Sequence, residues 1–361
     1  MKYVSYTDVG SKKTAKGIES KSVVDALRKR TEVDVIDRKR MGNLIPKART
    51  FVEKFIWHNY NGREKSVNEF DEKASKLLKP EDIVVLGVCG LIKSASNRKK
   101  LIVFATSAHP KSRQKIFEEE TGTFNKLTKI EEEICKVYSI ANLVLARSNF
   151  NRKTLIENGI DKNKIVLIGV GVDLTKFTPA EKTEETFRVL FLANAGILKG
   201  LQYLLKAWEN LNLDNSELII AGLMYPDVQQ TIKKYKHLKN VKYVGFVNSR
   251  EYYQKSDVYV LPSLTEGSPQ TALEAMASGI PIIGFENSGF LCKRGGFIIP
   301  NKDVEALKEK IRFLYDNPNE RQRIGKIARE EAKEYSHEKY GENCAKKILK
   351  VANQVKERKE I

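Results

Sequence analysis

The sequence predicts an α/β protein with two domains, each built on a parallel β-sheet. Residues 258–284 carry the first observation, because they follow the order strand, loop, short helix and strand that is typical of a βαβ unit. The second observation is the length of 361 residues, since one hydrophobic core rarely serves more than about 250–300 residues. The third is the ordinary globular composition, with 41% hydrophobic and 30% charged residues. We therefore expect two domains of roughly 150–200 residues each.

Proline and glycine mark the ends of the elements in this βαβ unit. The first strand, residues 258–261, stops at Pro262, and the helix is closed by Gly279 with Pro281 just beyond it. Alanine, leucine and methionine surround Glu274 on the helix, so the helix should be buried. A buried carboxylate costs several kcal/mol, roughly, unless a partner compensates it. Glu274 therefore predicts a ligand contact or, alternatively, a carboxylate satisfied by backbone groups or by an arginine.

A second carboxylate stands eight positions before Glu274. Glu266 lies in the loop at the carboxyl end of the preceding strand, where open α/β sheets bind their ligands. The residues that follow it are Gly267, Ser268, Pro269 and Gln270. We expect them to form a helix N-terminus, whose backbone N–H groups bind anions. Two carboxylates that accept sugar hydroxyls would then flank a phosphate site, and this arrangement predicts a nucleotide-sugar pocket.

The segment EGSPQTALEAMASGIPII, residues 266–283, resembles the E-x7-E signature of retaining GT-B glycosyltransferases, the glycogen-synthase-like group that includes glycosyltransferase family 4. Residues 141–177 resemble a second family passage, A-D-x-V-I-A-x-S … I-x-x-I-P-N-G-V-D-x-x-x-F. The matching residues there are Ser148, Gly171, Val172, Asp173 and Phe177. The resemblance covers nearly the whole chain and is specific from about residue 141 to residue 300. It implies a GT-B fold, in which two Rossmann-like domains face each other across a cleft.

The resemblance also implies a division of the chain. Residues 1–177 would form the acceptor-side domain and residues 178–186 the linker. Residues 187–338 would form the domain that binds the nucleotide-sugar donor. Residues 339–361 would be a final helix that crosses back to the N-terminal domain.

Lys199 and Asn194 match the family passage that contacts the donor diphosphate. That passage reads roughly F-V-G-R-x-x-x-x-K-G, and Lys199 matches its lysine. Asn194 stands where the family has arginine, so it can donate a hydrogen bond but brings no charge. The resemblance further implies that Glu266 holds hydroxyls of the donor sugar and Glu274 those of the ribose. We expect Lys199 and Glu266 to act in catalysis.

Four more residues complete the predicted site. Gly17 stands in the loop that faces the interdomain cleft in the family, although the usual pair of glycines is Lys16-Gly17 here. His109 follows the strand at residues 101–105 and matches a family histidine that contacts the donor sugar and aligns the acceptor, so we expect it to act in catalysis as well. Gly222 ends the strand at residues 218–221, and Phe246 lies where the family lines the nucleobase slot.

The resemblance implies transfer of a sugar from a UDP-, GDP- or ADP-linked donor to a glycan or glycolipid acceptor, with retention of anomeric configuration. No D-x-D motif is present, so we expect no metal, and we expect no cofactor beyond the nucleotide-sugar co-substrate. Two alternatives stay open. One is a basic nucleic-acid- or surface-binding protein with a catalytically silent fold, although nucleic acid is not the expected partner. The other is a GT-B sugar-nucleotide epimerase, which needs several active-site carboxylates and histidines, whereas the chain holds four histidines.

The net charge of +18 is concentrated in the N-terminal half. Residues 1–180 contain 35 Lys and Arg against 22 Asp and Glu, a net charge of +13. Within this half, residues 38–60 mix cations with aromatic residues and could contact an anionic membrane or a lipid acceptor. These residues are Lys39, Arg40, Lys47, Arg49, Phe51, Phe55 and Trp57. A core helix that buries the aromatics, or a generally lysine-rich composition, would explain the pattern equally well.

The remaining features indicate a cytoplasmic protein, with peripheral attachment to the inner membrane face as an option. No apolar run reaches the ~18–20 residues of a membrane span. The sequence MKYVSYTDVG lacks the apolar region of a signal peptide. The four cysteines have no C-x-x-C spacing, which predicts neither a disulfide framework nor a zinc site.

Overall fold

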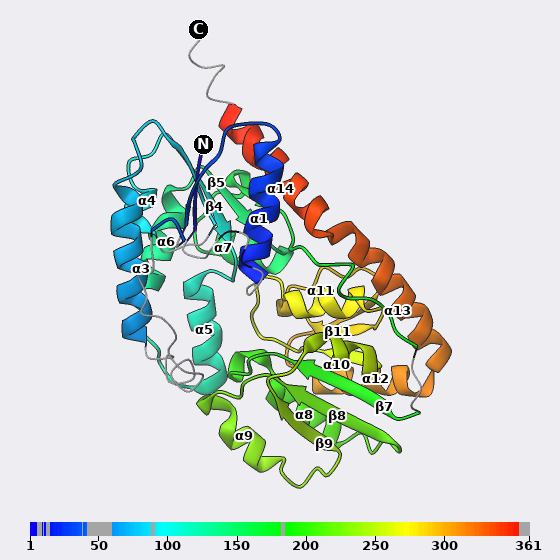
Figure 1. Cartoon of the computed structure of the whole chain (residues 1–361). Helices are drawn as coiled ribbons and strands as arrows, with labels where there is room; N and C mark the ends of the chain where they lie inside the picture. Colours follow the sequence, from blue (N-terminus) through cyan, green and yellow to red (C-terminus); the bar gives the residue numbers. More distant parts are fainter. Residues whose placement is uncertain are drawn as a thin grey trace. The chain divides into compact units, whose positions relative to one another are not determined.

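Figure 1 shows a computed structural model of the chain. The structure describes residues 1–5, 9, 11, 15–37, 39–41, 60–87, 91–181 and 185–353. The chain divides into two compact units. The N-terminal unit contains Met1–Gln114, Lys126–Ile168 and His337–Ile361, and the C-terminal unit contains Lys115–Asn125 and Gly169–Ser336.

The N-terminal unit is built on a six-stranded parallel sheet with strand order β2-β1-β3-β4-β5-β6. The strands are β1 Lys2–Ser5, β2 Asp34–Asp37, β3 Ile83–Leu86, β4 Lys100–Ala105, β5 Leu143–Ala146 and β6 Ile165–Leu167. Alternate residues of β4 belong to two separate core clusters, with Leu101 and Val103 in one and Ile102 and Phe104 in the other. Both faces of the sheet are therefore covered, which explains why its strands are apolar throughout.

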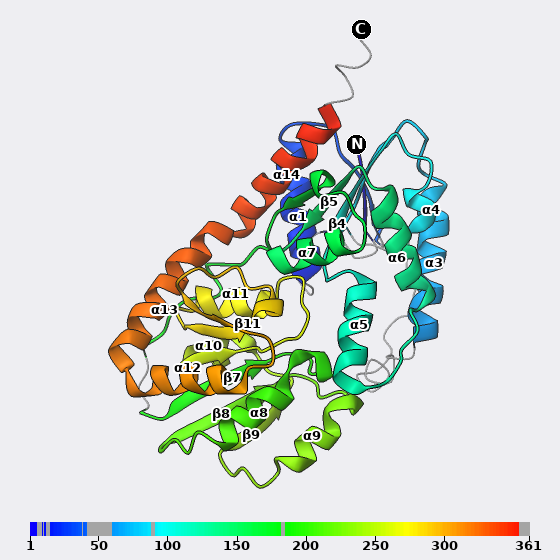
Figure 2. The same cartoon turned by 180° about the vertical axis from the view of Figure 1, so that it is seen from behind.

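Seven α-helices surround this sheet among the residues that the structure describes. They are α1 Ala15–Arg28, α3 Tyr60–Ser75, α4 Ile92–Ala95, α5 Pro110–Thr121, α6 Lys129–Ile140, α7 Asn149–Glu157 and α14 His337–Asn353. The final helix, α14, lies beside α1 (Figures 1 and 2). Gly341 permits this approach, because a Cβ there would stand 2.3 Å from the Ser22 carbonyl oxygen. Glu342 of α14 pairs with Arg30 and, at 3.2 Å, with Lys29.

The C-terminal unit has a second six-stranded parallel sheet, with strand order β12-β11-β10-β7-β8-β9. The strands are β7 Phe187–Leu192, β8 Ser216–Ala221, β9 Val241–Gly245, β10 Val258–Val260, β11 Ile282–Phe285 and β12 Gly296–Ile299. The helices are α8 Leu201–Glu209, α9 Gln229–Lys234, α10 Ser249–Lys255, α11 Gln270–Ala277, α12 Val304–Asp316 and α13 Pro318–Ala332. The predicted βαβ unit is β10-α11-β11, and its two strands are direct neighbours in the sheet.

The end of α5 belongs to the C-terminal unit, and the carboxylate of Glu120 connects it there. The Glu120 side chain is almost fully buried. It accepts a hydrogen bond from the Tyr203 hydroxyl at 2.7 Å and another from Gln202 Nε2 at 2.7 Å. It also pairs with Lys302 at 2.8 Å. These three partners satisfy the buried charge.

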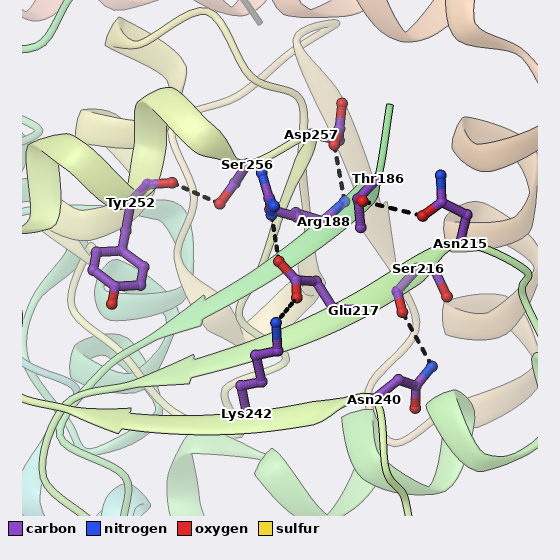
Figure 3. Close-up of polar contacts among 10 residues, drawn as sticks. All are labelled: Thr186, Arg188, Asn215, Ser216, Glu217, Asn240, Lys242, Tyr252, Ser256 and Asp257. Carbon is purple, nitrogen blue, oxygen red and sulfur yellow. Dashed lines mark hydrogen bonds and ion pairs between the residues drawn. The ribbon is translucent and has the colours of Figure 1, made fainter. Parts of the chain in front are cut away.

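Charged side chains connect the amino ends of the central strands in the C-terminal unit (Figure 3). Glu217 of β8 lies between Arg188 of β7 and Lys242 of β9 and forms an ion pair with each. Asp257, just before β10, accepts a hydrogen bond from the Arg188 backbone N–H at 2.9 Å. We interpret this group as a structural one that stabilises the register of four adjacent strands. It lies at the edge opposite to the one where parallel sheets bind ligands.

Candidate functional site in the C-terminal unit

Asn194 and Gly222 follow neighbouring strands, β7 and β8, at the carboxyl edge of the sheet. Asn194 is exposed, and its Oδ1 accepts the Leu223 backbone N–H at 3.3 Å. Gly222 has a φ of +113°, and a Cβ there would stand 2.0 Å from the carbonyl oxygen of Ala193. Only glycine fits this close approach of two chain segments. The structure thus places the two predicted residues together where ligands of such sheets bind.

Phe246 follows the next strand, β9, at the same edge. Gly245 ends that strand, and its carbonyl accepts the Gly222 N–H at 2.7 Å, so the exits of β8 and β9 are joined. The Phe246 side chain is 77% exposed, which is unusual for a large apolar residue beside a sheet. An exposed ring in this place can stack on a flat ligand group such as a nucleobase.

Lys199 and Glu266 form an ion pair between Nζ and Oε1, although 67 residues separate them in the sequence. Lys199 ends a 3-10 turn, Ile197–Lys199, after β7, and Glu266 lies in the loop after β10. Their side chains are 29% and 16% exposed, so both keep access to solvent. The structure therefore brings a cation for a phosphate and a carboxylate for sugar hydroxyls to one place.

Gly200 makes this juxtaposition possible. Its φ is +74°, and a Cβ there would stand 1.8 Å from the Pro262 carbonyl oxygen. Next to this contact, the Leu264 N–H donates to the Leu198 carbonyl at 2.9 Å. The turn that carries Lys199 and the loop that carries Glu266 are thus in direct backbone contact.

The loop that carries Glu266 is held from its other side by a short 3-10 turn, Glu286–Ser288. The Glu266 N–H donates to the Asn287 carbonyl at 3.1 Å, and Asn287 Nδ2 donates to the Leu264 carbonyl at 3.1 Å. Ser288 Oγ donates to the Ser263 carbonyl at 3.2 Å. These bonds lie within the protein, so the loop and the carboxylate it carries are positioned by the fold itself.

Helix α11 begins at Gln270, as the segment QTALEAMAS predicts. Gln270 is its first residue and Pro269 is its N-cap, so Gly267 and Ser268 belong to the preceding loop. Proline has no N–H and fixes φ, which suits the entry to a helix. The four residues predicted to form the helix N-terminus thus divide into two loop residues, the N-cap and the first helical residue. The N–H groups of the first turn start at Gln270.

Glu274 is only partly buried, whereas the sequence predicts full burial. Its helix neighbours Leu273 and Ala275 are buried, but the Glu274 side chain reaches an edge of the helix that keeps some solvent access. Burial of the carboxyl group raises its pKa to about 7, against a lowering by the Tyr253 hydrogen bond and the Lys176 charge. Its Oε2 accepts from the Tyr253 hydroxyl at 3.1 Å. The partner is thus a tyrosine, not the backbone group or arginine of the alternative prediction.

Gly17 and His109 belong to the N-terminal unit. Gly17 is buried within α1. His109 is 2% exposed and directly precedes α5, and its Nδ1 accepts the Lys111 N–H at 3.3 Å. Burial, with a smaller contribution from the Lys111 charge, lowers its pKa to about 4. The imidazole is therefore neutral near pH 7 and carries its proton on Nε2.

Sequence reasoning missed Tyr253, the partner of Glu274. Tyr253 lies on α10 and is fully buried, and its ring contacts that of Tyr259 at a centroid distance of 6.1 Å. The sequence feature that could have pointed to Tyr253 is its position: it lies near the end of the helix that precedes the central βαβ unit, four residues before Asp257. From the sequence, a tyrosine at this position is interpreted as a core residue. Its contact with Glu274 is not predictable from local patterns, because the two residues are 21 positions apart.

Whole-chain structural comparison decides the fold. The chain superimposes on sucrose-phosphate synthase from Thermosynechococcus elongatus with a TM-score of 0.71 and 17% identity, covering 98% of each chain. It superimposes on HepE from Anabaena, solved with UDP-glucose, with a TM-score of 0.68 and 15% identity, covering 97% of this chain and 100% of the other. The fold is GT-B. At these identities the GT-B likeness concerns architecture alone.

Sequence comparison adds information on the C-terminal unit of this GT-B protein. Residues 174–331 match the family described as Glycosyl transferases group 1. One curated relative is the N,N'-diacetylbacillosaminyl-diphospho-undecaprenol alpha-1,3-N-acetylgalactosaminyltransferase of Campylobacter jejuni, which is 27% identical over 55% of this chain and 57% of its own length. The chain spans about half the length of the curated relatives it matches.

The basic and aromatic segment of the N-terminal half lies largely outside the described residues. Lys39 and Arg40 are described and exposed, and Arg40 pairs with Asp34. Lys47, Arg49, Phe51, Phe55 and Trp57 fall outside the described ranges. Within those ranges, no helix combines the length and the apolar character needed to cross a bilayer.

Proposed function

We propose that the protein is a retaining glycosyltransferase of the family 4 type, which transfers a sugar from a nucleotide-diphosphate donor without a metal ion. The observation that carries this proposal is the Lys199–Glu266 ion pair, which backbone contacts between the two loops hold in place. The loop of Glu266 leads into α11, and Glu274 lies on that helix. The C-terminal unit thus has three groups that a donor site needs: a cation for the diphosphate, a carboxylate for the sugar and a second carboxylate for the ribose. The match of residues 174–331 to group 1 glycosyl transferases supports the same activity.

Each residue of the site has a role in this proposal. Lys199 and the N–H groups at the start of α11 stabilise the negative charge that develops on the departing diphosphate. Glu266 accepts hydroxyls of the donor sugar, and Glu274 accepts those of the ribose. Asn194 donates a hydrogen bond to the diphosphate, and Phe246 stacks on the base. Four of these residues lie in segments that follow strands at the carboxyl edge of one sheet, and Glu274 lies on α11, the helix after the loop that carries Glu266.

The N-terminal unit supplies the acceptor side. His109 is neutral, so its Nε2–H can donate a hydrogen bond to a sugar oxygen without adding charge. The acceptor hydroxyl attacks on the face from which the diphosphate departs, which retains the anomeric configuration. The departing oxygen takes up the acceptor proton, so no carboxylate nucleophile is required.

A screen for donor hydrolysis tests the proposed function. The protein is incubated with UDP-, GDP- and ADP-linked sugars, with and without EDTA, and release of the nucleotide is measured. Release from one class of donor that persists in EDTA is the expected result. Binding of a nucleotide without release from any donor would instead favour the catalytically silent surface-binding protein. Interconversion of the sugar on the intact donor would favour the epimerase.

Replacing Glu274 with glutamine is expected to weaken binding of the nucleoside diphosphate by about 1.5–3 kcal/mol, the usual contribution of hydrogen bonds to a charged group. The amide has nearly the same shape, so the Tyr253 contact and the fold should persist. Calorimetry measures the affinity, and circular dichroism confirms folding. Unchanged affinity in a folded variant would show that Glu274 has a structural role only.

We further propose a lipid-linked acceptor at an anionic membrane surface. The support is the basic N-terminal half of the chain and the relative from Campylobacter jejuni, whose name specifies an undecaprenol-linked acceptor. Anionic headgroups attract such a surface, and the attraction decays over a Debye length of about 8–10 Å near physiological salt.

The membrane proposal predicts flotation with acidic liposomes but not with neutral ones, and less binding as salt rises. Serine at Lys39, Arg40, Lys47 and Arg49 together should abolish flotation. Donor hydrolysis should stay unchanged, because Lys199 and Glu266 belong to the C-terminal unit. Equal flotation on neutral vesicles would assign the attachment to Phe51, Phe55 and Trp57. Equally tight binding of nucleic acid at physiological salt would remove the lipid assignment.

A further inference from the structure

The Tyr253 hydroxyl lies near two hydrogen-bond acceptors, one of them on Glu274, but it has only one proton to donate. The hydroxyl oxygen lies 2.9 Å from the Thr271 carbonyl oxygen and 3.1 Å from Glu274 Oε2. Both neighbours are acceptors when Glu274 is ionised, but a tyrosine has one O–H to donate. Tyr253 is fully buried, so the bulk solvent does not reach its hydroxyl.

Two arrangements of the protons resolve this conflict. If Glu274 is protonated, it donates to the Tyr253 oxygen and Tyr253 donates to the Thr271 carbonyl. If Glu274 is ionised, Tyr253 turns its proton to the carboxylate. The raised pKa of Glu274, about 7, makes both forms accessible near neutral pH. Hydroxyl groups of a ligand can be accepted by both oxygens only in the ionised form.

The surroundings of the carboxyl group contain few other charges. Tyr259 from β10 lies beside Tyr253, and its hydroxyl lies 2.7 Å from Thr271 Oγ1 and 3.3 Å from the Leu192 carbonyl. Lys176, from the segment before β7, adds a positive charge that favours ionised Glu274. The burial that opposes ionisation outweighs both Lys176 and the Tyr253 hydrogen bond. Tyr253 therefore affects both the orientation of the Glu274 side chain, through its hydrogen bond, and the charge of that side chain, through its pKa.

We propose that Tyr253 is a positioning residue, whose hydroxyl holds Glu274 in the orientation and ionised form that accept the ribose hydroxyls of a nucleoside diphosphate. This inference rests on the proposed function. It assigns Tyr253 no contact with the ligand, since the side chain is buried behind α11 and acts through Glu274.

Calorimetry with ribonucleotides and deoxyribonucleotides tests this inference. UDP, GDP and ADP are titrated into the protein, each beside its 2'-deoxy counterpart, over a range from about pH 5.5 to about pH 8.5. The wild type should prefer the ribonucleotide by roughly 10-fold, the equivalent of one hydrogen bond to a charged group. Affinity should rise with pH through the titration of Glu274 and then level, because the ligand binds the ionised form. Binding near pH 6 should release a proton, seen as a dependence of the heat on the buffer.

The isosteric variant Tyr253→Phe removes only the hydroxyl. Since that hydroxyl lowers the pKa of Glu274, its loss should move the rise in affinity to higher pH and remove most of the preference for ribose. The matched control is Tyr259→Phe, which loses a buried hydroxyl of the neighbouring ring that does not bond to Glu274. The control should lose stability to a similar degree while it keeps the ribose preference and the wild-type pH profile.

The outcomes separate the inference from the proposed function. If none of the three nucleotides binds the wild type, the proposed function fails. Binding to the wild type without a ribose preference would remove Glu274 from the ribose site, and the inference with it. A ribose preference and pH profile that survive in Tyr253→Phe would overturn the inference and leave the proposed function intact. If Tyr253→Phe does not fold, the wild type decides. Near pH 6 it should release more protons with the ribonucleotide than with the 2'-deoxy counterpart, whose terminal phosphate titrates in the same way, and equal release contradicts the inference.

Discussion

Replacing Lys199 with alanine is expected to lower the rate of nucleotide release by roughly 10²–10³-fold, the usual effect of losing one group that stabilises charge in the transition state. The reason is local. Asn194 stands where the resembled family pattern has arginine, so Lys199 is the cation that the predicted site offers to the diphosphate. Its loss also leaves Glu266 without its ion-pair partner. The measurement is kcat for donor hydrolysis, with circular dichroism to verify folding.

Lys242→Ala is the matched control for this variant. Lys242 also pairs with a largely buried glutamate, Glu217, but at the amino ends of the strands, away from the site (Figure 3). Its replacement should leave kcat unchanged. Asn194→Arg should be tolerated or should raise the rate, because Asn194 is exposed and an arginine adds charge for the diphosphate. Wild-type turnover in Lys199→Ala would show that the diphosphate is held elsewhere.

Replacing Gly200 with alanine is expected to destabilise the C-terminal unit by roughly 3 kcal/mol or more and to abolish donor hydrolysis. The added Cβ would stand 1.8 Å from the Pro262 carbonyl oxygen, so one of the two loops must move. That movement separates Lys199 from Glu266, because Gly200 lies next to the lysine and Pro262 begins the loop of the glutamate. Thermal or denaturant unfolding measures the loss of stability, and nucleotide release measures the loss of activity.

Gly159→Ala is the control that separates the effect of left-handed backbone strain from the effect of the steric clash between residue 200 and Pro262. Gly159 has a φ of +85°, yet a Cβ there meets no atom within 4 Å. Alanine at this position should therefore cost only about 1–2 kcal/mol, the penalty for the left-handed backbone. The substitution leaves Lys199 and Glu266 in place, so donor hydrolysis should continue. Equal effects of the two glycine variants would mean that the contact between Gly200 and Pro262 is not needed to assemble the site.

The elements of the fold were predictable because their signals are local. The strands of both sheets are short apolar runs, and Gly279 with Pro281 marked the end of α11. Length indicated two domains, and the residue pattern from Glu266 to Glu274 indicated a ligand site at the carboxyl end of β10. These inferences need only residues that are near each other in the chain.

The start of α11 at Gln270 was predictable, because glycine, serine and proline before it are typical of a helix entry. The conformation of the loop before the helix was not predictable. Bonds from Asn287 and Ser288 hold that loop, and both residues lie beyond the helix in the sequence.

By itself, the sequence determined which chemical groups the proposed donor site has: a cation at Lys199, carboxylates at Glu266 and Glu274, and a helix start between them. The tertiary structure decided which of these groups meet and in what state. The contact between Gly200 and Pro262 joins Lys199 to Glu266, and the contact between Tyr253 and Glu274 links a carboxylate to a buried hydroxyl. Local patterns carry no information about such contacts, because each depends on the packing of segments that are distant in the chain. The raised pKa of Glu274 likewise follows from burial, which only the folded chain establishes.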